Sequence, residues 1–365
     1  MRIEIAERLK PFSHLPGASS ILPGSRYQIQ VFPACIKVFD LSTFSSPLIL
    51  ELQFKIKGPV QNFTVQNDLE KGCIRVWAET VFGFYRYSLR SCQNTFGLFF
   101  ELEKTDQETL SFFSKEKEWH LKAKESRLLL SSESAMSSDF LPGLERLSLG
   151  SHKSQDWEMI KRRLDFSEIF PLWYRLGQLI PKVESPSTEG TFLLLHECQV
   201  ALAQRCAESV MKSYQKLFLA GFKSLLVPTL QDPFYQGILP DKELSSEASA
   251  LTLLSQGAQL MRQLFIQQEK ERIDLLPLLP ASFHCGRFVN LEIMQGKFAL
   301  EWSKKKIRRC EFHTGKEQET AIYLNARHFK QCRIREGKKD QGRMILLCQP
   351  LQLKKDHYYF FDNFI

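Results

Sequence analysis

The 365-residue sequence lacks the patterns that mark several classes of protein. No apolar run reaches the roughly 18–20 residues that a helix needs to cross a bilayer, so we expect no membrane span. The first residues, "MRIEIAERLKPFSH", carry charges throughout and contain no apolar core, so we expect no secretory signal. Both absences predict a soluble, cytoplasmic protein.

Cysteine pairs and nucleotide or hydrolase motifs are also missing. The nine cysteines are odd in number and form no C-x-x-C pair, which argues against a disulfide framework and against a zinc site. We expect reduced, mostly buried thiols and no metal. The patterns G-x-x-x-x-G-K-[S/T], G-x-G-x-x-G, H-E-x-x-H and G-x-S-x-G are absent, and no cofactor is expected.

Positive charge is concentrated in the last quarter of the chain. Residues 281–365 contain 17 Lys/Arg against 9 Asp/Glu, which equals the net charge of +8 for the whole chain, so the first 280 residues are neutral overall. A basic face there is suited to nucleic acid, acidic lipid or an acidic protein partner. The run "KKKIRR" at 304–309 has a second interpretation, because charges between strands commonly protect sheet edges. Nucleic acid is not expected as a partner.

The first 130 residues predict an antiparallel β-sandwich. Apolar and polar residues alternate at 26–32, 48–56, 73–79, 82–90 and 95–103, the period of half-buried strands. Turn residues such as Pro23-Gly24 and Lys71-Gly72 separate these segments, and no helical pattern intervenes. A serine-rich stretch closed by Pro-Gly, residues 131–143, then predicts a linker.

The middle of the chain, residues 144–280, has a helical period. Apolar residues in 191–222 recur at spacings of 7, 4, 4, 4 and 3, which predicts one long helix. Residues 156–180 predict one or two shorter helices interrupted at Pro171. A further helix is expected after Ser245-Ser246, with a stripe from Leu251 to Phe265 and a continuation through "QQEKERID". We therefore expect four to six helices.

The last part, residues 281–365, returns to strands. Pro277 and Pro280 prevent any helix from continuing, and "KFALEW" then begins an alternating pattern. Further short strands are expected at 307–313, 320–324, 344–348 and 357–361. The sequence thus predicts an α+β multidomain protein with an N-terminal antiparallel β-sandwich, an all-α middle domain and a small, basic C-terminal β-domain.

This order, together with the stretch around 245–312, resembles the bacterial family 95 glycoside hydrolases, inverting enzymes of the α-fucosidase type. Their architecture is a β-sandwich, an (α/α) barrel and a C-terminal β-domain. Residues 275–280, "LLPLLP", are similar to the leucine-proline knot that follows the last barrel helix, and Gly286, Gly296 and the strand ending in Trp302 are similar to the segment after it. The resemblance implies this architecture and a carbohydrate ligand, but the matching stretch contains no catalytic group.

The helical part is too short for a complete barrel. Twelve helices of about 11 residues with loops of about 4–6 residues need roughly 190 residues. Residues 144–280 number 137. A shortened, partial (α/α) barrel is therefore expected, unless a second copy of the chain completes it.

Candidate catalytic residues are acids in apolar or loop contexts. An inverting glycosidase needs two carboxyl groups roughly 6.5–9.5 Å apart, one of them protonated. Glu197 follows an apolar run and suits a general acid if it is buried; otherwise it lies on the polar side of its helix. Asp232 and Asp241 enclose an aromatic loop with Phe234 and Tyr235, which suits either a sugar site or a plain helix connection.

Three functions follow from these patterns. The first is a glycoside-hydrolase-like protein that has lost catalysis and acts by binding carbohydrate or protein. The second is an active inverting glycosidase with a reduced barrel or one completed by a homodimer. The third is an interaction protein whose basic C-terminal part docks on an acidic protein partner.

Overall fold

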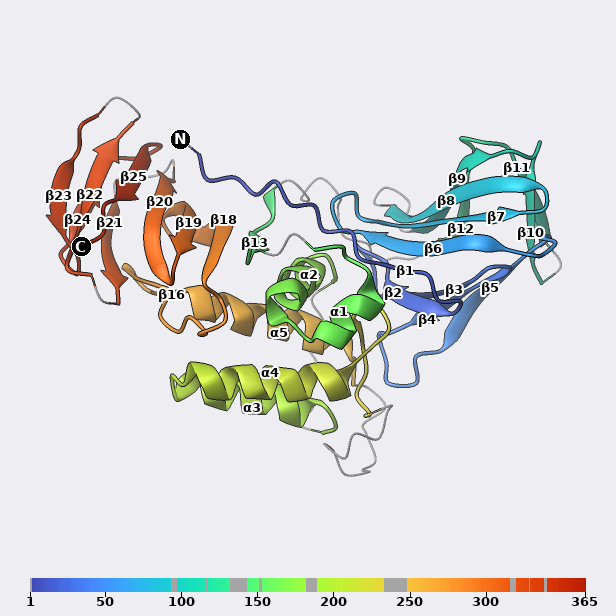
Figure 1. Cartoon of the computed structure of the whole chain (residues 1–365), viewed down its shortest axis with the longest axis horizontal. Coiled ribbons are helices and arrows are strands. Elements are labelled where there is room, and N and C mark those ends of the chain that lie inside the picture. Colours follow the sequence, from blue (N-terminus) through green and yellow to red (C-terminus); the bar gives the residue numbers. More distant parts are fainter. Residues whose placement is uncertain are drawn as a thin grey trace.

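The computed structural model describes residues 2–92, 97–115, 117–131, 143–150, 153–181, 189–232, 248–315, 320–327, 329–337 and 340–365. These residues form a mixed α+β structure in which five helices lie between two groups of strands. Figure 1 shows the amino-terminal strands at one end of an elongated molecule, the carboxy-terminal strands at the other end, and the helices between them.

Two six-stranded antiparallel sheets make up the amino-terminal part. The first has the order β1-β6-β7-β8-β9-β12, with strands Phe12–Ser13, Gln61–Asp68, Cys73–Thr80, Gly83–Cys92, Gly97–Thr105 and Ser126–Ser131. The second has the order β11-β10-β5-β4-β3-β2, with strands Lys117–Leu121, Leu110–Ser114, Leu48–Phe54, Cys35–Asp40, Tyr27–Phe32 and Ala18–Ile21.

Aromatic residues join the two sheets face to face. Phe54 of the second sheet stacks on Tyr87 of the first, with ring centroids 5.4 Å apart, and lies 5.9 Å from Phe100. Such aromatic pairs stabilise a core beyond the apolar area that they bury. The alternation that predicted strands at 26–32, 48–56, 73–79, 82–90 and 95–103 is confirmed, because a strand lies at each of these positions.

Five helices follow. Their bounds are Trp157–Arg163 for α1, Phe166–Gln178 for α2, Phe192–Ala203 for α3, Ala207–Gly221 for α4 and Leu251–Phe265 for α5. The expected number of four to six helices is confirmed for the described part of the chain. Helices α2 and α5 approach closely, since a Cβ added to Gly177 would lie 2.6 Å from the backbone oxygen of Leu254.

Two helix predictions are wrong in detail. Residues 191–222 form a pair, α3 and α4, because Arg205 adopts a left-handed backbone conformation with a φ of 54° and Cys206 is extended. The regular apolar spacing therefore runs across a chain reversal. In the preceding segment the break lies at Leu164, with a φ of 49°, while Pro171 lies inside α2.

The expected continuation of the last helix through "QQEKERID" is also wrong. α5 ends at Phe265, and the next residues form a hairpin of β16 (Ile266–Glu269) and β17 (Arg272–Leu275). The leucine-proline segment then folds back on the helix end, where the amide of Leu276 donates to the Phe265 carbonyl at 2.8 Å. The predicted N-caps Ser245-Ser246 lie outside the described residues, as do residues 132–142 of the predicted linker.

Three further sheets complete the structure. The smallest pairs β14 (Phe222–Lys223) with β15 (Val227–Pro228). The largest has the order β13-β18-β19-β20-β25-β22-β23, with strands Arg146–Ser148, Cys285–Ile293, Gly296–Ser303, Lys306–Thr314, Tyr358–Asp362, Gln331–Glu336 and Arg343–Leu346. The last has the order β16-β17-β21-β24, in which β21 spans Thr320–Ala326 and β24 spans Leu351–Leu353. All five strands predicted after residue 296 are present.

The sequence predicted an all-α middle part, but residues 144–280 also contain strands. β13 pairs with β18, and β17 pairs in parallel with β21, so residues from 144–280 belong to the carboxy-terminal sheets. One continuous buried cluster contains residues from the amino-terminal sheets, from the helices and from the carboxy-terminal strands. These long-range pairings leave no sign in local periodicity, which reports only the neighbours of each residue.

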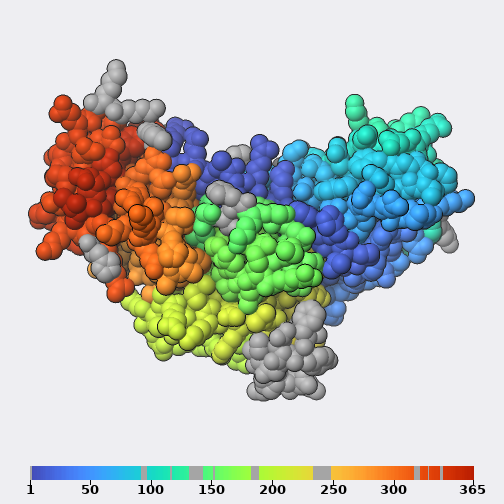
Figure 2. All heavy atoms as spheres, in the orientation of Figure 1, coloured from blue at the N-terminus to red at the C-terminus, as the bar shows by residue number. Residues whose placement is uncertain are grey.

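The first residues connect the two ends of the molecule. Ile3 packs on Val289 and Ala299 of the largest sheet, whereas the amide of Leu9 donates a hydrogen bond to the Glu70 carboxylate in the β6–β7 turn of the first sheet at 3.0 Å. Figure 2 shows these amino-terminal residues, in blue, along the upper surface between the orange and cyan parts. Residues 2–11 thus form an extended strap that holds the carboxy-terminal sheet to the first one.

Candidate functional site

The five residues that the sequence suggested for catalysis and sugar binding do not form a described site. Glu197 is exposed on α3 and forms an ion pair with Lys216 of α4 at 3.1 Å, so the burial that a general acid requires is missing. Asp232 is partly buried at the end of a described segment. Asp241, Phe234 and Tyr235 lie outside the described residues.

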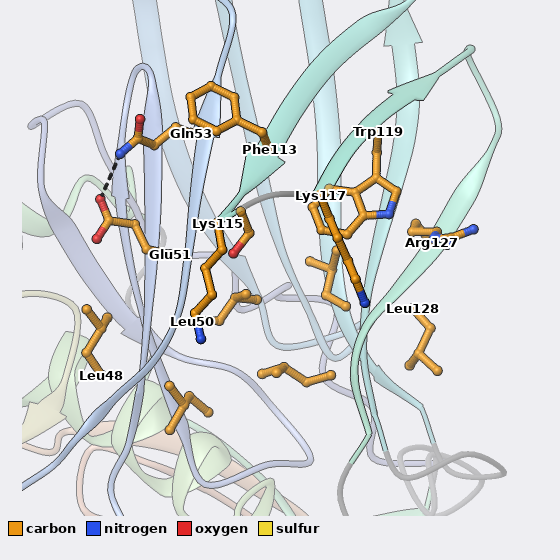
Figure 3. Close-up of a pocket in the computed structure, with 14 residues that line it drawn as sticks. Leu48, Leu50, Glu51, Gln53, Phe113, Lys115, Lys117, Trp119, Arg127 and Leu128 are labelled. Carbon is orange, nitrogen blue, oxygen red and sulfur yellow. Dashed lines mark hydrogen bonds between the residues drawn. The ribbon is translucent and has the colours of Figure 1, made fainter.

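A large groove lies instead in the amino-terminal part, between β5 and β12 and below the β10–β11 hairpin. Its volume is about 1080 Å³. Figure 3 shows Leu50 of β5 and Leu128 of β12 on opposite sides of this space. Six aliphatic side chains line it, in two consecutive runs on the two strands: Leu48, Ile49, Leu50, Leu128, Leu129 and Leu130.

The hairpin of β10 and β11 closes one end of the groove. Phe113 and Trp119 belong to the lining, and Trp119 stacks on the buried Phe112 with ring centroids 5.4 Å apart. This stacking fixes the indole in place, so the wall of the groove at this end is formed by a supported aromatic side chain.

The charged side chains of the groove are mostly cationic. Lys115, Lys117 and Arg127 line it and are exposed, and Figure 3 shows Lys115 and Lys117 extending from the hairpin into the space. Among the residues that the structure describes, no ion pair joins any of these three to an acid. Glu51 is the one carboxylate among the described residues of the lining, and it accepts a hydrogen bond from Gln53 at 3.3 Å.

Glu51 also affects the thiol next to it. The Cys35 thiol lies 3.7 Å from a Glu51 carboxylate oxygen. Partial burial raises the pKa of Cys35, and the negative charge of Glu51 raises it further. The cysteine next to the groove is therefore held as a thiol, which is the unreactive form.

A second cavity, of about 540 Å³, lies between α2 and α5 and contains a polar cluster. Both oxygens of Glu145 accept hydrogen bonds, from Arg262 Nε at 2.9 and 3.1 Å, from the Glu292 amide at 2.8 Å and from the Tyr174 hydroxyl. Burial raises the pKa of Tyr174 well above its ordinary value. Glu292, the other acid of the lining, is exposed and lies 3.7 Å from Lys297.

Several arginines of the largest sheet are paired with acids. Cross-strand neighbours on one face alternate in sign across five strands, in the order Arg287, Glu301, Arg309, Asp362 and Arg333. The Arg287–Glu301 and Arg333–Asp362 pairs are 2.8 Å long. This charged row is close to neutral, while residues 304–306 remain exposed at the β19–β20 turn.

The described residues contain no group of three His, Cys, Asp or Glu side chains able to hold a metal ion, and none of their helices is long and apolar enough to cross a membrane. Eight described cysteines are free, and only four of these are buried, so the expectation of mostly buried thiols is met by half of them.

No family model matches this chain, and no curated protein matches it either.

The groove was not predicted from the sequence, because the two apolar runs that line it were not recognised as a sign of a binding surface. Strands β11 and β12 were not predicted, although Leu128–Leu130 and Leu48–Leu50 are both runs of three consecutive apolar residues. In a half-buried strand every second residue should be polar. An apolar run at both faces of a strand therefore indicates a further apolar surface, and here the two runs line the same groove.

Proposed function

We propose that this protein is a binding protein without hydrolytic activity, and that the groove between β5 and β12 takes an extended polypeptide segment. The observation that carries the proposal is the lining itself: aliphatic side chains on two sides, and at one end cations that form no ion pair with any described residue. Aliphatic walls accept apolar side chains, and the cations favour a segment that also carries acidic residues.

The arrangement of carboxylates supports binding over hydrolysis. An inverting hydrolase requires two carboxyl groups that face one substrate. In the described part of the chain, the groove contains Glu51 as its one acid, and in the second cavity the oxygens of Glu145 are all engaged by hydrogen bonds. Neither place offers a free acid and base pair.

A polypeptide fits the groove better than a sugar. Sugar sites present flat aromatic faces and many hydrogen-bonding groups to the ring hydroxyls. This groove has six aliphatic side chains against two aromatic ones, and of the aromatic pair Trp119 uses one ring face on Phe112. Binding of a hydroxylated ligand would bury little apolar surface and gain little free energy, whereas leucine-like side chains would bury the aliphatic walls.

We also propose that the chain shares its descent with the family 95 glycoside hydrolases and has a cytoplasmic location. The order of strands, helices and strands supports this relation. So does the pair of Gly286 and Trp302, which are cross-strand partners at the joint that resembles those enzymes. Five helices in the described residues are fewer than a closed barrel needs, which supports the loss of catalysis.

Selection from a displayed library of random short peptides tests the proposed function, with a panel of oligosaccharides in parallel. We expect the purified protein to enrich peptides and to bind no sugar. Leu128→Asp should abolish the enrichment, because it places a charge in the apolar wall. The matched control is Leu193→Asp on α3, since Leu128 and Leu193 are equally exposed, at 39%.

Three results would contradict the proposal. They are enrichment that survives Leu128→Asp, binding of an oligosaccharide in place of peptides, and failure of the unaltered protein to enrich any peptide. Hydrolysis of aryl-glycosides that is lost in Glu197→Gln or Asp232→Asn would also contradict it and would restore the enzymatic alternative.

A further inference from the structure

The backbone of β5 offers an open edge to the groove. β4 pairs with β5 along nearly its whole length, from Gln53 back to Leu48. On the other side β10 pairs only with Phe54 and Gln53, and β10 ends at Ser114. Within the described part of the chain, no strand pairs with residues 48–52 on this second side.

Peptide groups of β5 point into this open space. The amide of Phe54 donates to the Ala34 carbonyl at 2.9 Å, on the β4 side, and the amide of Lys55 donates to the Ser111 carbonyl at 3.0 Å, on the β10 side. Backbone groups of successive residues in a strand point to opposite sides. The N–H and C=O of Glu51 therefore point to the β10 side, into the groove and beyond the end of β10.

The other edge beside the groove is less suitable for pairing. β12 is an edge strand, but its register shifts between Leu128 and Leu130. A bulge of this kind disrupts the ladder and twists the edge, which is one way in which proteins block strand addition. The stretch of β5 from Leu50 to Gln53 keeps a regular register with β4.

Lys115 and Lys117 lie where an added strand would begin. Lys115 lies in the turn at the tip of the β10–β11 hairpin, and Lys117 starts β11. Because β10 ends at this tip, a strand that continued its line along β5 would have its first residues beside these two lysines. A carboxylate at that end of the ligand would be paired with them, and the residues after it would face the leucines.

We propose that the bound segment is added to β5 as a β-strand, hydrogen-bonded to Glu51 through its backbone, with an acidic residue at the hairpin end followed by apolar residues. This inference rests on the proposed function, and it specifies the conformation and chemistry of the ligand. About four residues, or roughly 13 Å of extended chain, span the open part of β5.

A proline at position 51 tests the backbone contact. Glu51→Pro removes the N–H that points into the groove, and it leaves the β4 ladder intact because that N–H does not point toward β4. We expect peptides selected by the unaltered protein to bind Glu51→Pro about tenfold more weakly. Glu51→Gln is the comparison variant, since it also removes the charge but keeps the N–H. Only the loss of affinity in Glu51→Pro that exceeds the loss in Glu51→Gln reports the backbone contact, and equal losses would contradict it.

Charge reversal tests the position of the acidic residue. Lys115→Glu with Lys117→Glu should weaken binding by tenfold or more. In this variant, an acidic residue added to the end of the peptide that lies at the β10–β11 hairpin should no longer increase the affinity. Lys122→Glu with Lys124→Glu is the control, because both lysines are exposed and neither lines the groove. Equal losses in the two double variants would contradict the placement.

Alternate N-methylation of a selected peptide separates this inference from the proposed function. An added strand presents every second N–H to β5, so methylation should weaken binding at alternate positions and be tolerated between them. This test needs no altered protein and holds even if Glu51→Pro fails to fold. If peptides are selected through the groove but methylation shows no alternation, strand addition is wrong while the binding function stands. If no peptide is selected, both are wrong.

Discussion

The cluster around Glu145 allows a quantitative prediction for Glu145→Gln. This change keeps the size of the side chain and removes its charge. The carboxylate is 12% exposed, and it accepts from Arg262, whose side chain is 24% exposed, at 2.9 Å. It also accepts from the Glu292 amide on β18, so it connects the chain before β13 with α5 and the largest sheet.

The expected cost follows from charge pairing and desolvation. Two unit charges 2.9 Å apart attract by about 6 kcal/mol at an effective dielectric constant of about 20, and desolvation offsets a large part of this. Breaking a buried pair costs about 3–5 kcal/mol, because the remaining charge loses its partner. Since Arg262 keeps some contact with solvent, we expect a smaller cost than for a fully buried pair, about 2–3 kcal/mol of unfolding free energy.

Urea unfolding of four proteins tests this value: the unaltered chain, Glu145→Gln, Arg262→Gln and the double variant. In the double variant no charge is left without its partner, so its loss should be smaller than the sum of the two single losses by about 1–3 kcal/mol. A loss below about 0.5 kcal/mol in Glu145→Gln would refute the reasoning. So would strict additivity of the two single changes.

Three further predictions concern other parts of the fold. Gly286→Ala should lower the free energy of unfolding, measured in urea, by about 1–3 kcal/mol, since its Cβ would meet the Trp302 ring at 2.3 Å; an unchanged free energy would contradict this close approach. Arg205→Val should lower the melting temperature and Arg205→Gly should not, because a φ of 54° is unfavourable for β-branched residues; equal melting would argue against the turn between α3 and α4. Burial acts to raise the pKa of Glu301, but its two arginine neighbours in the charged row outweigh burial and lower it. Its stabilising contribution is therefore present above about pH 4.5 and lost as pH falls through the lowered value, so Glu301→Gln should lose less stability on acidification than the unaltered protein.

Local periodicity predicted the strands well because each strand buries one face. The alternation at 26–32 and 73–79 corresponds to buried Ile29 and Val76, and both segments are strands of the facing sheets. The same method failed at 191–222, where apolar spacing continued across a chain reversal. Both α3 and α4 bury residues of the stripe, so the stripe records burial on each side of the turn and contains no signal for the left-handed conformation of Arg205.

The groove could not be predicted from one segment of the sequence. Its walls come from residues 48–53 and 127–130, which belong to different sheets, and its end comes from a hairpin between them. The open edge of β5 exists only because β10 ends early, and strand pairing over such distances is set by the whole fold. The five residues chosen for sugar chemistry were selected from sequence context alone, and the one best described, Glu197, is an exposed surface residue.

The positions of the charged residues show why the net charge of a sequence segment does not locate a binding surface. Only part of the carboxy-terminal excess of positive charge is paired: the charged row places Arg287, Arg309 and Arg333 beside two acids on neighbouring strands, while residues 304–306 are exposed. The first 280 residues are neutral in sum, yet Lys115 and Lys117 reach into one groove without an acid paired to them in the described chain. An attraction depends on which charges remain unpaired at one place, because paired charges cancel within a few ångströms. Binding to the groove should therefore weaken as salt is raised, and this dependence should decrease in the Lys115→Glu, Lys117→Glu variant.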